Sequence, residues 1–334
     1  MKIYINNEKY FDKAYDIFCE SVNKNEVLYL PMPKNSFENI LKRQDSIFAA
    51  AEKNGELLGF LVANTLREKA YITLVFVKNK YRNKGIGKGL IKELEGVLKA
   101  KGYNSIFIDH MNPVELGWRI PESSCTHNKI PGVYIESPAI KFFKSAGFSA
   151  AHEEIAMYRE LQGFSMPEEI LSVIENLKQE GIEVGELKNP YVDFSGLFDR
   201  LQSEYWRDSI ASEIQAHKEN RGNPNPRFWA DGMPPKAPRK ILAAVHEGAM
   251  VGFTGPVDVQ KNLRGWFTGL CVDPNFGRRR IGETLFNLLL DAFQKEGAQF
   301  VSLYTGAKNP AQKIYLRAGL KPAARFAAME KKLK

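Results

Sequence analysis

The fold is decided by the stretch VKNKYRNKGIGK, which runs from Val77 to Lys88. It lies between a β-rich apolar segment, Ala70–Val77, and a segment whose apolar residues from Leu90 to Leu98 share one helical face. A glycine-containing loop at a helix start presents backbone N–H groups outward, and the helix dipole adds to their positive potential. Gly85 and Gly87 let the backbone approach an anion without a Cβ in the way. The stretch therefore predicts a loop that binds a pyrophosphate.

Basic side chains reinforce this interpretation, because Lys80, Arg82, Lys84 and Lys88 add positive charge to the loop. A Walker-type loop requires Gly-Lys-Ser/Thr after four intervening residues, and that pattern is absent. A dinucleotide fingerprint requires three glycines at fixed spacing, which is also absent. A glycine-rich turn without a ligand stays open as the alternative.

The elements around the loop form an ordered series. The sequence predicts a strand at residues 1–5, a helix over Asp12–Val22, and a hairpin of Ser46–Lys53 and Glu56–Asn64 that turns at Asn54-Gly55. Ala70–Val77 follows as a central strand, then the helix, and then a short strand over Ser105–Asp109.

The second half repeats this order. It has a strand over Ile182–Leu187, helical stretches up to about Asn220, and a hairpin of Lys240–His246 and Met250–Val259. A strand over Gly265–Val272, a helix over residues 282–296 and a strand over Gln299–Tyr304 follow. The sequence thus predicts two similar domains, residues 1–163 and 181–334, joined by a connector helix within residues 164–180.

Long segments distinguish the two halves. The first half has an insert over Met111–Ser137, and the second has a proline- and glycine-rich loop over Asn220–Pro238. Long loops at different places on a repeated scaffold usually carry what distinguishes two sites. Acceptor-pocket candidates within the insert are Glu115, Trp118, Arg119, His127 and Tyr134, and those of the second half are Phe228, Trp229, Asp231 and Asp258. Loop packing is the alternative role for each of them.

The composition limits the class of protein. The chain has 334 residues, with 44% apolar and 26% charged residues, and no apolar run of membrane-spanning length. It begins without the features of a signal peptide, which favours a cytoplasmic location. The three cysteines are far apart and indicate neither a disulfide framework nor a close-spaced metal cluster, and no metal is predicted. A net charge of +8 favours an anionic partner, but no basic run is interleaved with aromatics, so neither nucleic acid nor membrane is expected.

The pattern Arg82-x-x-Gly85-x-Gly87, after a strand and at the start of a long helix, resembles motif A of the GNAT superfamily of N-acetyltransferases. Phe142-Phe-Lys-Ser-Ala-Gly147-Phe148 resembles motif B of that superfamily. In the second half, Val272 to Gly282 resembles motif A again, and Asn309 to Leu320 closely resembles motif B. The resemblance implies two tandem α/β (α+β) domains, each with a mixed, mostly antiparallel sheet, splayed central strands and flanking helices.

The two halves depart from the family pattern differently. Phe143 stands where the family commonly has a tyrosine, whereas the second half keeps that tyrosine as Tyr315. Gly277 replaces the usual Arg or Gln of the second loop, and Arg280 replaces its first glycine. A side chain at position 280 either crowds the phosphates or binds them. Cofactor binding is therefore expected foremost in the first half.

The resemblance also implies the chemistry. Acetyl-CoA would lie between the splayed strands, its pantetheine arm paired with backbone near Phe76, and a primary amine of a small molecule or peptide would attack the thioester directly. The implied catalytic residues are Asp109 and His110 as base candidates and Tyr315 as the acid for the leaving thiolate. The alternative role of Asp109 is to cap a turn, and the alternative role of Tyr315 is to pack its helix.

The implied cofactor residues are Phe76, Val77, Arg82, Asn83, Lys84, Gly85, Ile86, Gly87, Lys88, Val272, Arg278, Arg279, Arg280, Ile281 and Gly282. A coenzyme-binding regulatory protein without turnover is the alternative function, and a monomer or homodimer is expected.

Overall fold

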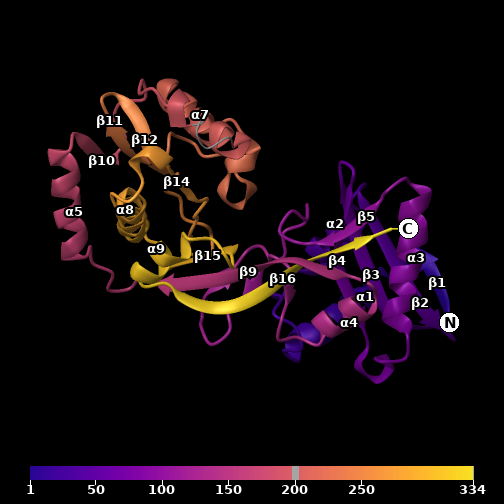
Figure 1. Ribbon diagram of the computed structural model, residues 1–334. Coiled ribbons are helices and arrows are strands. Elements are labelled where there is room, and N and C mark those ends of the chain that lie inside the picture. Colours follow the sequence, from indigo (N-terminus) through magenta and orange to yellow (C-terminus); the bar gives the residue numbers. More distant parts are fainter. Residues whose placement is uncertain (198–202, 334) are drawn as a thin grey trace. The chain divides into compact units, whose positions relative to one another are not determined.

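The structure is a computed structural model that describes residues 1–197 and 203–333 (Figure 1). It contains two compact units, and each unit takes residues from separate parts of the chain. The first consists of residues 1–156, 304–308 and the last segment from 323 onward, and the second holds the residues between them. The predicted boundaries, 1–163 and 181–334, do not include this return of the last segment to the first unit.

The first unit is built on a twisted sheet. Its neighbouring strands are β1 (Lys2–Ile5), β2 (Ser46–Lys53), β3 (Glu56–Leu66), β4 (Lys69–Val77), β5 (Ser105–Ile108) and β16 (Lys321–Lys332), in that order. All of these pairs are antiparallel except β4 with β5. Met329 of β16 lies opposite Ile108, so a strand from the end of the chain pairs with β5 in this sheet.

Helices cover both faces of the first sheet. The helices α1 (Phe11–Asn23) and α2 (Lys34–Leu41) pack on one face, and α3 (Ile86–Ala100) and α4 (Ala139–Ser145) pack on the other. Side chains alternate along a strand, and β2 shows the result. Its Ile47, Ala49 and Ala51 are buried with α3, whereas Phe48 and Ala50 are buried with α1. The α2 helix was not predicted from the sequence, because its apolar pattern is too short to indicate a helix.

The remaining elements of the first unit lie after β5. The insert contains the short strands β6 (Trp118–Arg119), β7 (Thr126–His127) and β8 (Val133–Tyr134), of which β6 and β7 pair with each other. The long strand β9 (Ser149–Glu160) follows α4 and begins in this unit. The first half therefore forms the predicted mixed, mostly antiparallel sheet with flanking helices.

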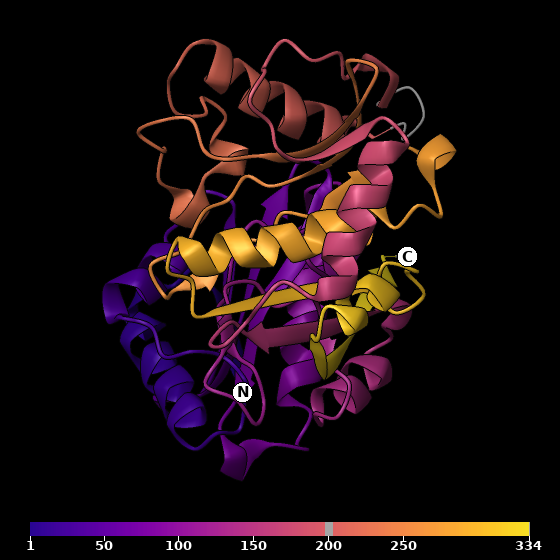
Figure 2. The same ribbon diagram turned by 90° about the vertical axis from the view of Figure 1, so that its left-hand side faces the viewer.

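The second unit has its own antiparallel sheet in the order β10 (Ile182–Glu186), β11 (Leu242–His246), β12 (Ala249–Thr254) and β14 (Leu270–Val272). The helix α8 (Ile281–Lys295) packs on this sheet, and α5 (Glu168–Gln179) lies against α8 (Figure 2). Further elements are α7 (Glu204–Lys218), α9 (Gln312–Arg317), and β13 (Arg264–Gly265), which pairs in parallel with β15 (Phe300–Gly306). Part of the predicted helical region, residues 198–202, lies outside the described residues.

One predicted strand of the second unit was wrong. Residues 265–272 form two short strands, β13 and β14, instead of one. Gly269 between them has a φ of +124°, and the Trp206 ring lies where a side chain at this position would be, 2.5 Å from an added Cβ. Local alternation of residue types carries no sign of this contact with α7. Within the described residues, no helix is long and apolar enough to cross a membrane.

Candidate functional site

The loop before α3 exposes a set of backbone amides. Gly85 caps the helix in the left-handed conformation, at a φ of +81°, and the Gly89 N–H is the first to bond back, to the Gly85 carbonyl at 2.9 Å. Among the described residues, the backbone N–H groups of residues 85–88 have no acceptor in the chain. Free amides at a helix start, together with the helix dipole, form an anion-binding site.

Two of the four basic residues of this loop carry uncompensated charge. Within the described part of the chain, Lys84 and Lys88 form no ion pair, and both side chains are exposed. Arg82, in contrast, pairs with Glu26 and donates its Nε hydrogen to the Val77 carbonyl at 3.0 Å. Lys84 and Lys88 are therefore the side chains best placed to meet a phosphate.

A carboxylate anchors the other end of the loop. Glu56, at the start of β3, accepts the Tyr81 hydroxyl at 2.6 Å and lies 3.0 Å from the amino groups of both Lys78 and Lys80. The hydrogen bonds from Tyr81, Lys78 and Lys80 lower the pKa of Glu56 to about 2. The short 3₁₀ turn η2 (Asn79–Tyr81) is thus tied to the hairpin, which fixes the path into Gly85.

We expect Glu56→Gln to lower the melting temperature at pH 7. The pKa of Glu56 in the folded protein is depressed, so its stabilising contribution is present above the ordinary value near 4.5 and is lost as the pH falls toward 2. The difference in melting temperature between parent and variant should therefore close between pH 4.5 and pH 2. Glu68→Gln, at an exposed turn away from the loop, is the control, and a constant difference for Glu56→Gln at all pH values would contradict the prediction.

The two glycines of the loop have different reasons to be glycine. Gly85 requires its left-handed φ, with open space around it. A Cβ on Gly87 would come within 2.8 Å of the Phe142 ring, so this glycine lets α4 pack against the start of α3. The structure therefore adds a packing reason for Gly87, and the close approach of an anion stays a prediction.

The central strands of the first unit separate. Within the described residues, β4 and β5 pair only at Ala70 with Ile106 and at Tyr71 with Phe107, and no strand pairs with the second half of β4 on that side. The Lys78 N–H donates to the Leu58 carbonyl at 2.9 Å, and peptide groups alternate in direction along a strand. The peptide groups of Phe76, two residues from Lys78, therefore point toward β3, and those of Val75 and Val77 point toward the side of β5, where the Val77 carbonyl accepts the Arg82 Nε hydrogen. The predicted pairing of the pantetheine arm with backbone near Phe76 stays a prediction, and the Phe76 side chain is buried against Phe60.

The strand end after β5 holds the two predicted bases. The Asp109 carboxylate accepts the Met111 backbone N–H at 2.7 Å, the turn-capping role named as its alternative. His110 is partly buried, and burial lowers its pKa. Its Nδ1 atom is buried without a hydrogen-bond partner among the described residues.

The second loop has the same path but different electrostatics. Arg280 takes the position of Gly85 and, like it, adopts a left-handed φ, +61°. Its guanidinium pairs with Glu169 of α5 and with Glu283 of α8, the latter at 3.0 Å. Arg317 also meets Glu283 at 3.0 Å. The Arg280 guanidinium is therefore ion-paired with two carboxylates, and its contact with phosphates stays a prediction.

A carboxylate occupies the first turn of α8. Glu283 is 4% exposed and lies three residues after Arg280, as Lys88 lies three residues after Gly85. Burial alone would raise the pKa of Glu283, but the bonds and charges of Arg280 and Arg317 outweigh it and lower the pKa. The second helix start thus carries a carboxylate, paired with the guanidinium groups of Arg280 and Arg317, where the first carries the amino group of Lys88.

The other predicted residues of the second loop have local contacts or turn conformations, and their cofactor role stays a prediction. Arg279 pairs with Glu180 at 2.9 Å, and Arg278 lies in the turn at a φ of +65°. Ile281 is buried, and a Cβ on Gly282 would meet Ile314 at 3.2 Å and the side chains of Leu270 and Val272. Gly282 therefore lets α8 pack closely on α9 and on β14.

Tyr315 of α9 lies in the interior of the second unit. It is 5% exposed, and its ring packs 4.9 Å from that of Phe286 and 5.8 Å from that of Phe267. Burial raises its pKa to about 12, so the hydroxyl keeps its proton at neutral pH. The ring environment fits helix packing and also fits a proton donor.

The model of the Acetyltransferase (GNAT) family matches residues 11–116 and 198–320. The chain belongs to the GNAT family. It is 35% identical, over 82 residues, to an uncharacterized N-acetyltransferase of Chlorobaculum tepidum. That similarity covers 24% of this chain and 52% of the relative, so the chain spans about half the length of the curated relative that it matches.

Solved GNAT structures share the fold over the whole chain. An N-acetyltransferase from Sphaerobacter thermophilus has a TM-score of 0.56 at 14% identity, covering 99% of this chain and 96% of its own. A tandem GNAT protein from the clavulanic acid biosynthesis pathway has a TM-score of 0.55 at 11% identity, covering 100% and 99%. A glucosamine N-acetyltransferase region of a fungal multi-domain β-N-acetylglucosaminidase has a TM-score of 0.63 at 14% identity, covering 98% of this chain and 38% of that protein. The tandem GNAT architecture is thereby confirmed.

The acceptor-pocket candidates of the first GNAT unit are bound into its insert. Trp118 is fully buried and donates its indole N–H to the Lys129 carbonyl at 3.1 Å, and its ring stacks on that of His127. Arg119 donates to the Val27 carbonyl at 2.9 Å. Tyr134 bonds to Glu136, which together with burial raises the pKa of Tyr134 to about 12. Glu115 lies near Lys129 at 3.7 Å. Trp118, Arg119 and Tyr134 thus bond within this unit, whereas Glu115 is exposed.

The candidates of the second GNAT unit belong to a buried polar network. Arg239 pairs with the fully buried Glu213 and with Asp258, the latter at 2.8 Å, and donates to the Phe228 carbonyl at 2.7 Å. Asp231 accepts the side chain of Gln260 at 2.9 Å, and the Trp229 indole donates to Asn223. Asp231 and Asp258 also line an open cavity of about 470 Å³. Glu213 and Arg239 could not be identified from the sequence, because no local pattern indicates an ion pair between residues 26 positions apart.

Proposed function

We propose that the first unit takes acetyl-CoA as its acetyl donor and transfers the acetyl group to a primary amine of a small molecule or peptide. One observation carries the proposal: the free amides of residues 85–88, flanked by Lys84 and Lys88 without ion pairs, lie at the end of a strand whose edge is open toward β5. A diphosphate fits the helix start, and an extended arm fits the strand edge.

The residues present suit the parts of coenzyme A. The amides of Gly85 to Lys88 would hold the diphosphate, with Lys84 and Lys88 neutralising its charge. Peptide groups of Val75 and Val77 would pair with the pantetheine arm as an added strand would. When bound, acetyl-CoA supplies a thioester whose acetyl carbon forms a bond to the amine nitrogen as its bond to sulfur breaks.

The chain's contribution to the reaction is mainly positioning. Free N–H groups of β4 would polarise the acetyl carbonyl, and binding both reactants in one place supplies much of the acceleration. Asp109 is committed to its turn, so we propose that ordered water takes the proton from the amine nitrogen. Phe143, which is buried in the first unit, offers no hydroxyl for the thiolate, so this proton would also come from water.

Calorimetric titration of the full chain with acetyl-CoA tests the proposal, followed by an assay of thiol release with a panel of amines that includes glucosamine and short peptides. We expect one coenzyme site per chain and turnover with at least one amine class. The absence of any binding would sink the proposal, and binding without thiol release for any amine would favour a regulatory protein.

Tyr315→Phe should leave the rate of acetyl transfer within about twofold, whereas removal of a working general acid costs about 10²–10⁴-fold. We expect the small effect because Glu283 and the paired Arg280 make the neighbouring loop unsuited to a phosphate. A large fall in kcat with an unchanged melting temperature would show instead that the second unit is the active one.

A further inference from the structure

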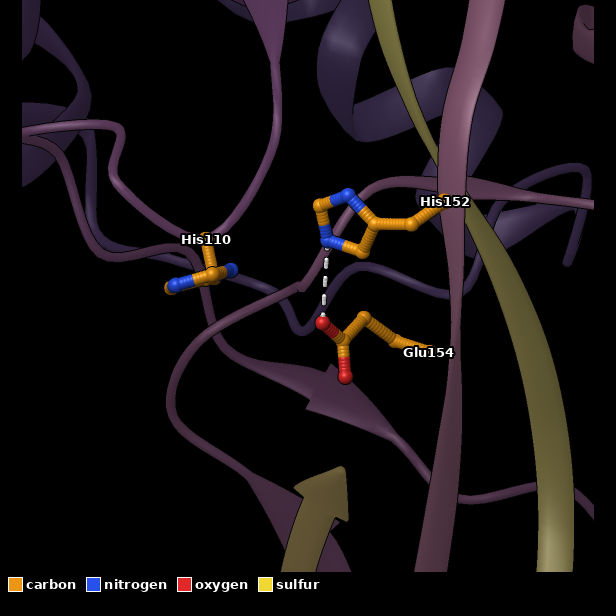
Figure 3. A group of neighbouring side chains, drawn as sticks. All are labelled: His110, His152 and Glu154. Carbon is orange, nitrogen blue, oxygen red and sulfur yellow. Dashed lines mark hydrogen bonds and ion pairs between the residues drawn. The ribbon is translucent and has the colours of Figure 1, made fainter. Parts of the chain in front are cut away.

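Three side chains away from the coenzyme loop meet within the first unit. His110 follows β5, and His152 and Glu154 lie two residues apart on β9, so they share one face of that strand (Figure 3). One nitrogen or oxygen atom from each of the three lies within 4.8 Å of the others. Two distant segments of the chain thus bring two imidazoles and a carboxylate together.

The environment of these groups leaves polar atoms in need of a partner. Glu154 is only 6% exposed, and one of its oxygens lies 3.1 Å from the His152 Nε2 atom. A buried carboxylate is costly unless it is paired or coordinates a metal. The Nδ1 atom of His110 is buried and has no hydrogen-bond partner within the described residues. The His152 side chain is 49% exposed, which gives an ion access from solvent.

We propose that His110, His152 and Glu154 bind a zinc ion. Two histidines and a glutamate form the protein ligand set of one class of open zinc site, in which a fourth position holds water. With bonds of about 2.0–2.1 Å, tetrahedral ligand atoms lie about 3.3 Å apart. His152 and Glu154 already have this separation, and a movement of the His110 ring of about 1–2 Å would close the set. The ligands come from positions 42 residues apart, so no sequence spacing signals the site.

Metal binding by the full chain tests the site independently of acetyl-CoA. The protein is stripped with a chelator and titrated with zinc chloride in competition with a chromophoric chelator. We expect one zinc ion per chain, and we expect His110→Ala, His152→Ala and Glu154→Gln each to weaken binding at least about tenfold. His246→Ala is the matched control, because His246 is the other histidine beside a glutamate, 4.0 Å from Glu247, and lies in the second unit.

Cobalt substitution adds a second readout, since a cobalt ion bound in a tetrahedral site absorbs visible light strongly and this absorption should disappear in the three ligand variants. Fewer than one zinc per chain in the parent, or equal affinities in the parent and all three variants, would overturn the proposal. If the Glu154→Gln variant does not fold, the zinc affinity of His152→Ala decides the test, because the exposed His152 side chain contributes little to packing. A loss of acetyl transfer in His152→Ala with no zinc bound by the parent would also overturn the metal site and would assign the His152–Glu154 pair to proton transfer.

Discussion

Gly85→Val should weaken acetyl-CoA binding by about 10- to 100-fold. Gly85 has a φ of +81°, a conformation that a β-branched residue adopts only as an outlier. The loop of the variant would relieve this strain by rotating its peptide groups, and the amides of residues 86–88 would no longer converge. Loss of one hydrogen bond to a charged group costs about 1.5–3 kcal/mol, which corresponds to this range of affinity. Calorimetry at constant ionic strength measures it.

The matched control for this variant is Gly102→Val. Gly102 follows the other end of α3, has a φ of +82° and, like Gly85, has nothing within 4 Å of an added Cβ. The two substitutions therefore impose the same backbone strain on the same helix, and both should lower the melting temperature. Only Gly85→Val should lower the affinity for acetyl-CoA. Equal losses of affinity in both variants would show that general destabilisation, and not the loop, is responsible.

Much of the first unit could be predicted because its signals are local. The Asn54-Gly55 dipeptide fixes the hairpin, and β2 has the predicted bounds, Ser46–Lys53. Burial of Ile47 on one face and Phe48 on the other follows from alternation along a strand. The bounds of α3 follow from its apolar stripe and from Gly102 at its end.

The path of the last strand could not be predicted in the same way. The residues from Lys321 to Lys332 read as a strand of whichever sheet is nearest in sequence, yet Met329 pairs with Ile108 of the first unit. Pairing between strands more than 200 residues apart depends on which sheet edge is open, and the local sequence does not encode this. The break between β13 and β14 could not be predicted for a related reason, since it depends on the contact of Gly269 with Trp206.

The candidate site was predictable in its backbone but not in its charge balance. Glycine positions revealed the loop before α3, whereas the carboxylates that hold its side chains, Glu26 and Glu56, come from other elements. The same limit applied to the second loop, where Glu169 of α5 holds Arg280. Which basic residues of the two loops form ion pairs was therefore decided only by tertiary contacts.

Lys88→Glu should reduce acetyl-CoA affinity at least about 100-fold, the larger effect of the two substitutions. The change gives α3 the charge that Glu283 gives α8, so it removes a charged hydrogen bond and adds repulsion in the same place. Lys92→Glu makes the same change in net charge one turn further along the exposed face and serves as the control. The difference in acetyl-CoA affinity between the two variants should become smaller with added salt, because exposed charges are screened.

A comparison of Lys88→Glu with Glu283→Gln also decides which of the two units binds the coenzyme. If the first loop holds the coenzyme, Lys88→Glu reduces the single binding site measured for the full chain, and Glu283→Gln leaves that site unchanged. If the second loop holds it, Lys88→Glu has no effect on affinity, and removal of the Glu283 charge strengthens binding. The sign of these two responses follows from electrostatics alone, because Lys88 forms no ion pair within the described residues and Glu283 is fixed between Arg280 and Arg317.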